Sequence, residues 1–265
     1  MSNLAVPGAT LYYESQGNGP LMVIVPASSG ALDSYRLLAE QFTADYTVAR
    51  YDRRGFSRSY LVDPQDYERR IETDADDVRR LIEHLGGATA IVVGSSSGAL
   101  VTLAVLTEHP DVVAKAVAYE PPAMTAWSGG QEWIDRFHSM YELYHRVGPR
   151  PAVTQFQEAA FAPSDLATMA AVADPAKDPY VVGNGTYWFG VAVGTALTGG
   201  PPHRSQRAGL PHWAPASGDE RRSVVPGRGA ARGVSAATVR RGASYAPRSY
   251  WCAGCGVEVL GASGV

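Results

Sequence analysis

The stretch from Ala90 to Leu106, Ala-Ile-Val-Val-Gly-Ser-Ser-Ser-Gly-Ala-Leu-Val-Thr-Leu-Ala-Val-Leu, decides the fold. Residues 90–93 form an apolar run that predicts a buried strand, and residues 99–106 begin a helix that stops before Pro110. The five residues between them have the pattern G-x-S-x-G, in which small neighbours let the middle serine occupy a tight, strained turn. Ser96 is therefore the candidate nucleophile. The N–H of Ser97, at the start of the helix, is a candidate donor to a developing oxyanion.

The residues around this turn alternate between short apolar runs and amphipathic segments. The runs predict strands buried on both faces, and the segments with apolar residues every three or four positions predict helices. Strand, helix, strand, helix with short loops indicates an α/β fold with a mostly parallel sheet covered on both faces. The expected strands are 21–25, 46–51, 90–93 and 112–119, and the expected helices are 33–42, 74–85 and 99–106.

Several motifs together resemble the α/β-hydrolase family, over about residues 8–195. The resemblance implies an α/β-hydrolase core in residues 1–122 and a helical cap in residues 123–198, with a mostly parallel sheet. The motifs that carry it are Val25-Pro26-Ala27-Ser28-Ser29-Gly30, Tyr51-Asp52-Arg53-Arg54-Gly55-Phe56-Ser57-Arg58-Ser59, Gly94 to Gly98, Glu108-His109-Pro110-Asp111-Val112-Val113 and Tyr119-Glu120-Pro121-Pro122. In the second motif, Ser57 stands where the family has a second glycine.

The resemblance also assigns roles to individual residues. It implies that Ser96 is the nucleophile and that the oxyanion donors are the N–H groups of Ser97 and of Ser28 or its neighbour. The neighbour stays open because Pro26-Ala27 replaces the family's usual His-Gly. Asp52 and Arg53 are expected to stabilise the loop beside the turn rather than to take part in chemistry.

The acid and base of a triad are harder to place. Glu120 follows the 112–119 strand, where some family members carry the acid, although the first interpretation is a structural residue of the Glu-Pro-Pro turn. The family carries its histidine near the C-terminus after the last strand. Here none of the six histidines follows a predicted C-terminal strand, so the base is missing and we expect impaired activity. The histidines are His84, His109, His138, His145, His203 and His212.

Aromatic residues recur at helical spacing in the cap between Gln131 and His145. Such a stripe indicates packing first, although cap aromatics of this family can also line the substrate cavity. An aromatic cavity favours an uncharged, fairly hydrophobic substrate. The stripe consists of Trp133, Phe137, Met140, Tyr141 and Tyr144.

Residues 199–265 differ in composition from the rest of the chain. They hold nine Arg, no Lys and three acidic residues, for a formal charge of +6, whereas residues 1–198 have 14 basic and 23 acidic residues, for −9. Gly, Ala, Arg, Ser and Pro dominate, so we expect this tail to be disordered and the family's last strands and helix to be missing. Such residues are typical of GC-rich codons read out of frame, and a frame change near residues 190–200 is our hypothesis for the tail.

Other functions of the tail have little support in the sequence. Cys252-Ala253-Gly254-Cys255 lacks the flanking elements of a redox pair and the further ligands of a zinc site. The arginines lack the interleaved aromatic residues and fold signature of a nucleic-acid binder. We therefore expect no metal, no cofactor and no nucleic acid.

The expected activity is that of a serine hydrolase acting through Ser96 on a small uncharged ester, lactone or similar acyl substrate. Two alternatives stay open: a non-catalytic binding protein on the same fold, and a cofactor-free haloperoxidase or acyltransferase. The chain has a net charge of −3, no apolar run long enough for a membrane span and no leader pattern at residues 1–4, so we expect a cytoplasmic protein. The oligomeric state is not predicted.

Overall fold

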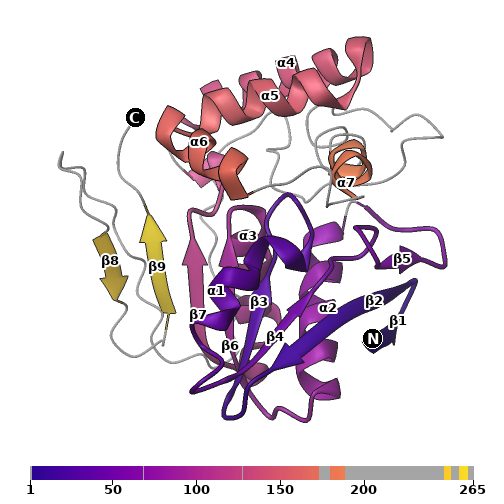
Figure 1. Ribbon diagram of the computed structural model, residues 1–265, viewed down its shortest axis with the longest axis vertical. Coiled ribbons are helices and arrows are strands. Elements are labelled where there is room, and N and C mark those ends of the chain that lie inside the picture. The colour runs from indigo at the N-terminus through magenta and orange to yellow at the C-terminus, as the bar shows by residue number, and fades with distance from the viewer. Residues whose placement is uncertain are drawn as a thin grey trace, which may run out of the picture.

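A computed structural model describes residues 2–67, 69–126, 128–172, 180–188, 248–251 and 257–261. Within these residues, strands join into one sheet in the order β1-β2-β4-β3-β6-β7-β9-β8, and β5 pairs with β2. Figure 1 shows this sheet at the base of the molecule and helices α4–α6 above the ends of the β7 and β9 arrows. The strands are β1 Ser2–Val6, β2 Ala9–Gln16, β3 Leu21–Val25, β4 Thr47–Tyr51, β5 Tyr60–Leu61, β6 Ala90–Ser95, β7 Val113–Tyr119, β8 Arg248–Trp251 and β9 Val257–Gly261.

The centre of the sheet is parallel and its N-terminal edge is antiparallel. Strands β4, β3, β6 and β7 run parallel to one another, whereas β2 pairs antiparallel with β1, β4 and β5. The expected α/β fold with a mostly parallel sheet is thus confirmed. The helices that accompany these strands are α1 Arg36–Glu40, α2 Arg70–His84, α3 Ser97–Glu108, α4 Gly130–Val147, α5 Pro149–Ala160, α6 Pro163–Val172 and α7 Val181–Tyr187, with short 3-10 segments at Leu32–Tyr35, Pro110–Val112 and Met124–Ala126.

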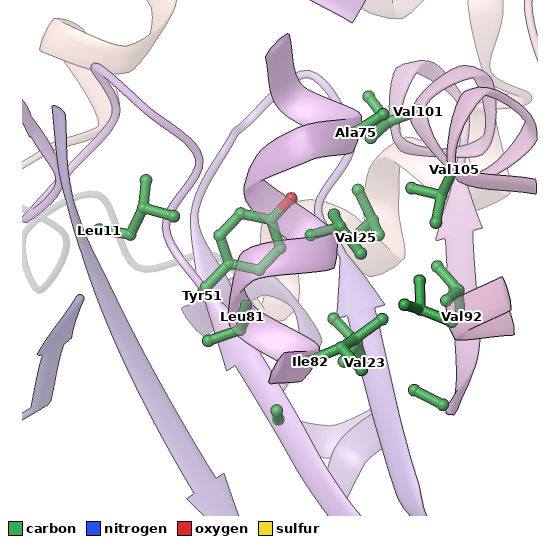
Figure 2. Close-up of a cluster of buried hydrophobic side chains, with 14 of the residues drawn as sticks. Leu11, Val23, Val25, Tyr51, Ala75, Leu81, Ile82, Val92, Val101 and Val105 are labelled. Atoms are coloured by element: carbon green, nitrogen blue, oxygen red, sulfur yellow. The ribbon is translucent and has the colours of Figure 1, made fainter. Parts of the chain in front are cut away.

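Strand β3 shows why a continuous apolar run marks the middle of such a sheet. All five of its residues are buried. Val23 and Val25 join the cluster on the α2 and α3 side, and Met22 and Ile24 join a second cluster with Ala39 of α1. Successive side chains point to opposite faces, so both faces need apolar residues. Figure 2 shows the first cluster, with β3, β4 and β6 packed against α2 and α3.

The expected helix at 33–42 is shorter in the structure and is divided in two. A 3-10 turn covers Leu32–Tyr35, and α1 follows from Arg36 to Glu40. Tyr35 lies at the junction with φ −114° and ψ 11°, and its hydroxyl reaches the loop after β3 and Ser95 of β6. The helix is thus interrupted where the Tyr35 side chain makes these contacts. The periodicity of the sequence does not show the interruption.

The described part of residues 123–198, where we expected a helical cap, contains the four helices α4 to α7, of which the sequence indicated one. The stripe on α4 packs against α5: Met140 and Tyr141 are buried with Ala152, and Phe137 and Tyr144 join the same cluster from half-buried positions. This confirms the packing interpretation of the stripe. Among the described residues, none of the helices is both long enough and apolar enough to cross a membrane.

The C-terminal edge of the sheet corrects one expectation. We expected the sheet to end at residues 113–119, yet β9 pairs parallel with β7, and β8 pairs antiparallel with β9. Residues Val257 and Val259 are β-branched, and the edge of β7 offers unpaired backbone groups to a passing strand. The rest of residues 199–265 lies outside the described residues. The prediction of disorder and the Cys252–Cys255 motif fall on that part.

Candidate active site

The turn between β6 and α3 places Ser96 in strained backbone geometry. Strand β6 ends at Ser95 and α3 begins at Ser97, so Ser96 alone makes the turn, with φ 51° and ψ −124°. A non-glycine residue with positive φ is rare, costs about 1–3 kcal/mol and is found most often at functional sites. The residue is half-buried.

The two glycines of the motif are required because backbone atoms lie where a side chain would be. A Cβ on Gly94 would lie 2.2 Å from the carbonyl oxygen of Gly98, and a Cβ on Gly98 would lie 2.4 Å from the carbonyl oxygen of Val25. Neither oxygen belongs to a flexible side chain that could move aside. The spacing G-x-S-x-G therefore indicates that β3, β6 and α3 approach one another closely at this turn.

We expect Gly98→Ala to lower the free energy of unfolding by about 1–3 kcal/mol, because the new methyl group overpacks the junction of α3 and β3. Gly183→Ala is the matched control, since a Cβ there meets nothing within 4 Å. It should leave stability unchanged or raise it, because alanine favours a helix over glycine. Urea denaturation of both variants measures the difference. Equal stability of Gly98→Ala and the parent chain would contradict the close approach.

The structure distinguishes between the two candidate donors in the loop after β3. The N–H of Ala27 already donates to the hydroxyl of Tyr35 at 3.0 Å, and that hydroxyl lies 2.7 Å from Ser95 Oγ. Among the described residues, the N–H of Ser28 has no such bond. The N–H of Ser97, at the first position of α3, has no partner within the helix. Of Ala27 and Ser28, Ser28 is thus the one whose N–H has no hydrogen-bond partner among the described residues, and Ser28 and Ser97 stay the candidate donors.

Glu120 lies next to the turn, also in strained geometry. It follows β7 directly with φ 48°, and the preceding residue, Tyr119, accepts a hydrogen bond of 2.8 Å from the N–H of Ser96. The carboxyl ends of β6 and β7 thus bring Glu120 beside the backbone of Ser96. Positive φ at both positions is the signal that separates Glu120 from an ordinary turn residue.

Asp52 and Arg53 hold the loops around the turn, as predicted. Asp52 is fully buried and accepts hydrogen bonds from the N–H of Leu32 at 2.8 Å and from Arg58 Nε at 2.6 Å. Arg53 donates to Ser97 Oγ at 3.0 Å and forms an ion pair with Asp74 of α2. Neither side chain is bonded to Ser96.

Buried charges beneath the site are paired. Burial would raise the pKa of Asp74, but the guanidinium groups of Arg53 and Arg70 outweigh it and hold that pKa below its ordinary value. Burial raises the pKa of Asp77 to about 6, although Arg54 donates two hydrogen bonds to its carboxyl group. Burial also raises the pKa of Tyr51 far above its ordinary value, so its hydroxyl stays neutral.

The histidines that the structure describes lie on other elements. His84 ends α2 and its Nε2 lies 2.8 Å from the hydroxyl of Tyr13, and His109 follows α3 with its Nε2 3.9 Å from Asp76. The twelve residues of α3 place His109 roughly 16–18 Å from Ser96 at 1.5 Å per residue. His138 and His145 are on α4. In the described part of the chain, no hydrogen bond joins a histidine to Ser96 Oγ, and His203 and His212 lie outside that part.

The cap contacts the core through residues that sequence reasoning missed. Asn184 of α7 accepts a hydrogen bond from the N–H of Ser57 and donates one to its Oγ, both at 2.9 Å. Ser57 has φ 47°, where the family has glycine, and its side chain is used in this contact. Tyr187 packs edge-on against Phe56 with ring centroids 4.8 Å apart. The serine at a position where the family has glycine was the signal that the sequence offered, but the partner of Ser57 is 127 residues away.

The described residues offer few groups for a second functional site. No group of His, Cys, Asp or Glu side chains there could hold a metal ion. A surface groove of about 580 Å³ lies between α4 and α5, on the cap and not at Ser96. Its lining residues are Ser139, Leu143, Arg146, Arg150, Pro151, Thr154, Gln155 and Glu158.

Comparison with known proteins agrees with this geometry. Over 144 residues the chain is 38% identical to the uncharacterized hydrolase YraK of Bacillus subtilis (strain 168), covering 54% of this chain and 53% of YraK. Over 124 residues it is 34% identical to the zearalenone hydrolase of Bionectria ochroleuca, covering 46% and 47%. The chain thus spans about half the length of the curated relatives it matches.

A solved structure shows the same fold. The enol-lactonase from Burkholderia xenovorans LB400 aligns with a TM-score of 0.56 and 22% identity, covering 70% of each chain. The family model of the alpha/beta hydrolase fold matches residues 20–147, which include the loop after β3, the turn at Ser96 and the end of β7. The resemblance to the alpha/beta hydrolase fold family is thus confirmed over residues 20–147.

Proposed function

We propose that the chain is a serine hydrolase that acts through Ser96 on a small uncharged ester, lactone or similar acyl substrate. The observation that carries the proposal is the strained turn at Ser96, with the N–H groups of Ser97 and Ser28 beside it. A strained serine with N–H donors on the adjoining helix and on the loop after β3 suits attack on a carbonyl group. Both curated relatives named above are hydrolases by name, which supports hydrolysis as the reaction.

The proposed reaction begins when Ser96 Oγ attacks the carbonyl carbon. The C=O π electrons move to the carbonyl oxygen, which then accepts hydrogen bonds from Ser97 and Ser28. The proton of Ser96 Oγ passes to solvent. Collapse of this intermediate breaks the bond to the alkoxide, which takes a proton from solvent and leaves as the alcohol, while the acyl group stays on Ser96. Water then attacks the acyl carbon, which releases the carboxylic acid and returns the proton to Ser96 Oγ. Glu120 is the proposed acid, because it lies beside Ser96 at the end of β7 and could orient a base.

The cap supports the substrate class. Aromatic and aliphatic side chains of α4 and α5 gather in one cluster with Trp188, which gives the cap an apolar interior. An uncharged acyl substrate fits such surroundings better than a charged one.

We further propose that turnover is weak. Without a base to accept its proton, Ser96 Oγ is a poor nucleophile, and only the oxyanion hole and binding accelerate the reaction. The described histidines are bonded or placed elsewhere. The same observation favours the second candidate, a non-catalytic binding protein on the hydrolase fold.

Labelling by a fluorophosphonate tests the proposal. Ser96 Oγ attacks phosphorus, the P–F bond breaks, fluoride leaves and the serine proton passes to solvent. We expect slow labelling that mass spectrometry maps to Ser96, together with weak turnover of p-nitrophenyl esters. Fast ester turnover would contradict the predicted impairment, and no labelling would favour the binding protein.

A further inference from the structure

The two N–H groups of the proposed oxyanion hole belong to separate segments. Ser28 is in the loop after β3, and Ser97 is the first residue of α3. A tetrahedral oxyanion needs both donors about 2.7–3.1 Å away at the same time. The distance between the two segments must therefore be held by contacts outside the donors themselves.

Arg53 makes contacts to both segments from a third one, the loop after β4. Its Nη1 donates to Ser97 Oγ at 3.0 Å and lies 3.3 Å from the carbonyl oxygens of Pro26 and Ala27. Its own N–H donates to the carbonyl oxygen of Gly30 at 2.8 Å. Arg53 thus touches the residues on both sides of Ser28 and the residue that carries the other donor.

The other end of the guanidinium group is anchored. Nη2 is bonded to Asp74 of α2, a residue that is only 1% exposed and also contacts Arg70 Nε at 3.5 Å. Arg53 itself is 5% exposed. A planar guanidinium group with both amino groups bonded cannot rotate freely, so it holds the loop carbonyl groups that it contacts in place.

We propose that Arg53 is the positioning residue of the oxyanion hole, which holds the loop of Ser28 against Ser97. This inference rests on the proposed function, since it concerns the same site. Tyr35 supports the loop from the other side, because its hydroxyl accepts the N–H of Ala27 and lies 2.7 Å from Ser95 Oγ. A displacement of about 1 Å at such a site can cost about 100-fold in rate.

The chain provides a matched control in the next residue. Arg54 is 4% exposed and is bonded to buried Asp77, as Arg53 is to Asp74. Its remaining bonds go to the carbonyl oxygen of Pro7 and to Gln65. Replacing Arg54 therefore removes a buried charge of the same kind without touching the loop of Ser28 or α3.

The test compares Arg53→Met, Arg53→Lys and Arg54→Met with the parent chain. The measured quantities are the maximal rate of fluorophosphonate labelling, the half-saturating concentration of the probe, and Tm. We expect Arg53→Met to lower the maximal rate about 10- to 100-fold with little change in half-saturation. Arg54→Met should stay within about threefold while losing similar Tm, and Arg53→Lys should recover part of the rate because a lysine retains the charge but not the fork.

Hydrogen exchange provides a readout that needs no chemistry. In Arg53→Met, the amides of residues 27–30 should exchange at least about tenfold faster than in Arg54→Met, because the loop has lost its anchor. If the parent chain does not label, the proposed function fails. Hydrogen exchange then remains the test of whether Arg53 holds the loop of Ser28. Equal exchange in the two variants, or equal losses of labelling rate, would overturn the inference.

Discussion

Ser96→Ala is expected to lose fluorophosphonate labelling and any ester turnover by at least about 1000-fold, because no other described side chain occupies the strained turn between β6 and α3. The fold should remain, since Ser96 Oγ forms no hydrogen bond within the described residues. Intact-mass analysis after a fixed labelling time measures the loss. Circular dichroism shows whether the variant is folded.

Two further variants sharpen this prediction. Ser34→Ala should label like the parent, because Ser34 is exposed and bonded to Ser29 near the same loop but is not at the turn. Ser96→Gly should be as unreactive as Ser96→Ala yet more stable than the parent by about 1 kcal/mol, because glycine adopts positive φ without strain. Labelling that persists in Ser96→Ala would show that another residue reacts and would remove Ser96 as the nucleophile.

Asp74→Ala is expected to lower the free energy of unfolding by about 3–5 kcal/mol, because it leaves Arg53 and Arg70 charged and buried without their shared partner. Asp76→Ala is the matched control on the same helix. Asp76 pairs with Arg79 and Arg80 at a half-exposed position, where solvent screens the interaction, so the loss should stay below about 1 kcal/mol. Denaturant titration at pH 7 compares the two.

The pH dependence of stability follows from the same carboxylate. The pKa of Asp74 is lower in the folded chain than its ordinary value of 3.8, so folding favours the ionised form. Its contribution is present at pH values above that ordinary pKa and is lost as the pH falls through the lower pKa of the folded state. Asp74→Asn should show a weaker loss of stability below about pH 4 than the parent. An unchanged acid dependence would mean that Asp74 is not held by the arginines.

Much of the site could be predicted from the sequence, because its geometry depends on residues that are close together in the chain. Gly94 and Gly98 flank Ser96 at fixed spacing, and the apolar run before them marks a strand, so the turn could be located without coordinates. Glu120 could be placed at the end of the next strand for the same reason. The edge strand β9 was missed, because a run as short as Val257–Gly261 has no pattern strong enough to stand out in the tail.

Contacts between distant segments could not be read in this way. Tyr35 looked like one member of a helical stripe, yet its hydroxyl accepts a hydrogen bond from the N–H of Ala27 in the loop after β3. Asn184 had no local signal at all, and its partner Ser57 was visible only as a departure from a glycine. Hydrogen bonds of this kind depend on where two segments meet, which neither periodicity nor spacing encodes.

The sequence by itself determined the α/β fold, the parallel core of the sheet and the identity of Ser96 as the residue at the turn. These follow from side-chain alternation and from the steric need for glycine, which act over a few neighbouring residues. Only the tertiary structure showed that Tyr35 takes up the N–H of Ala27 and that Arg53 joins the loop of Ser28 to Ser97. Those outcomes depend on buried polar groups finding partners across the chain, because an unpaired group away from water is costly.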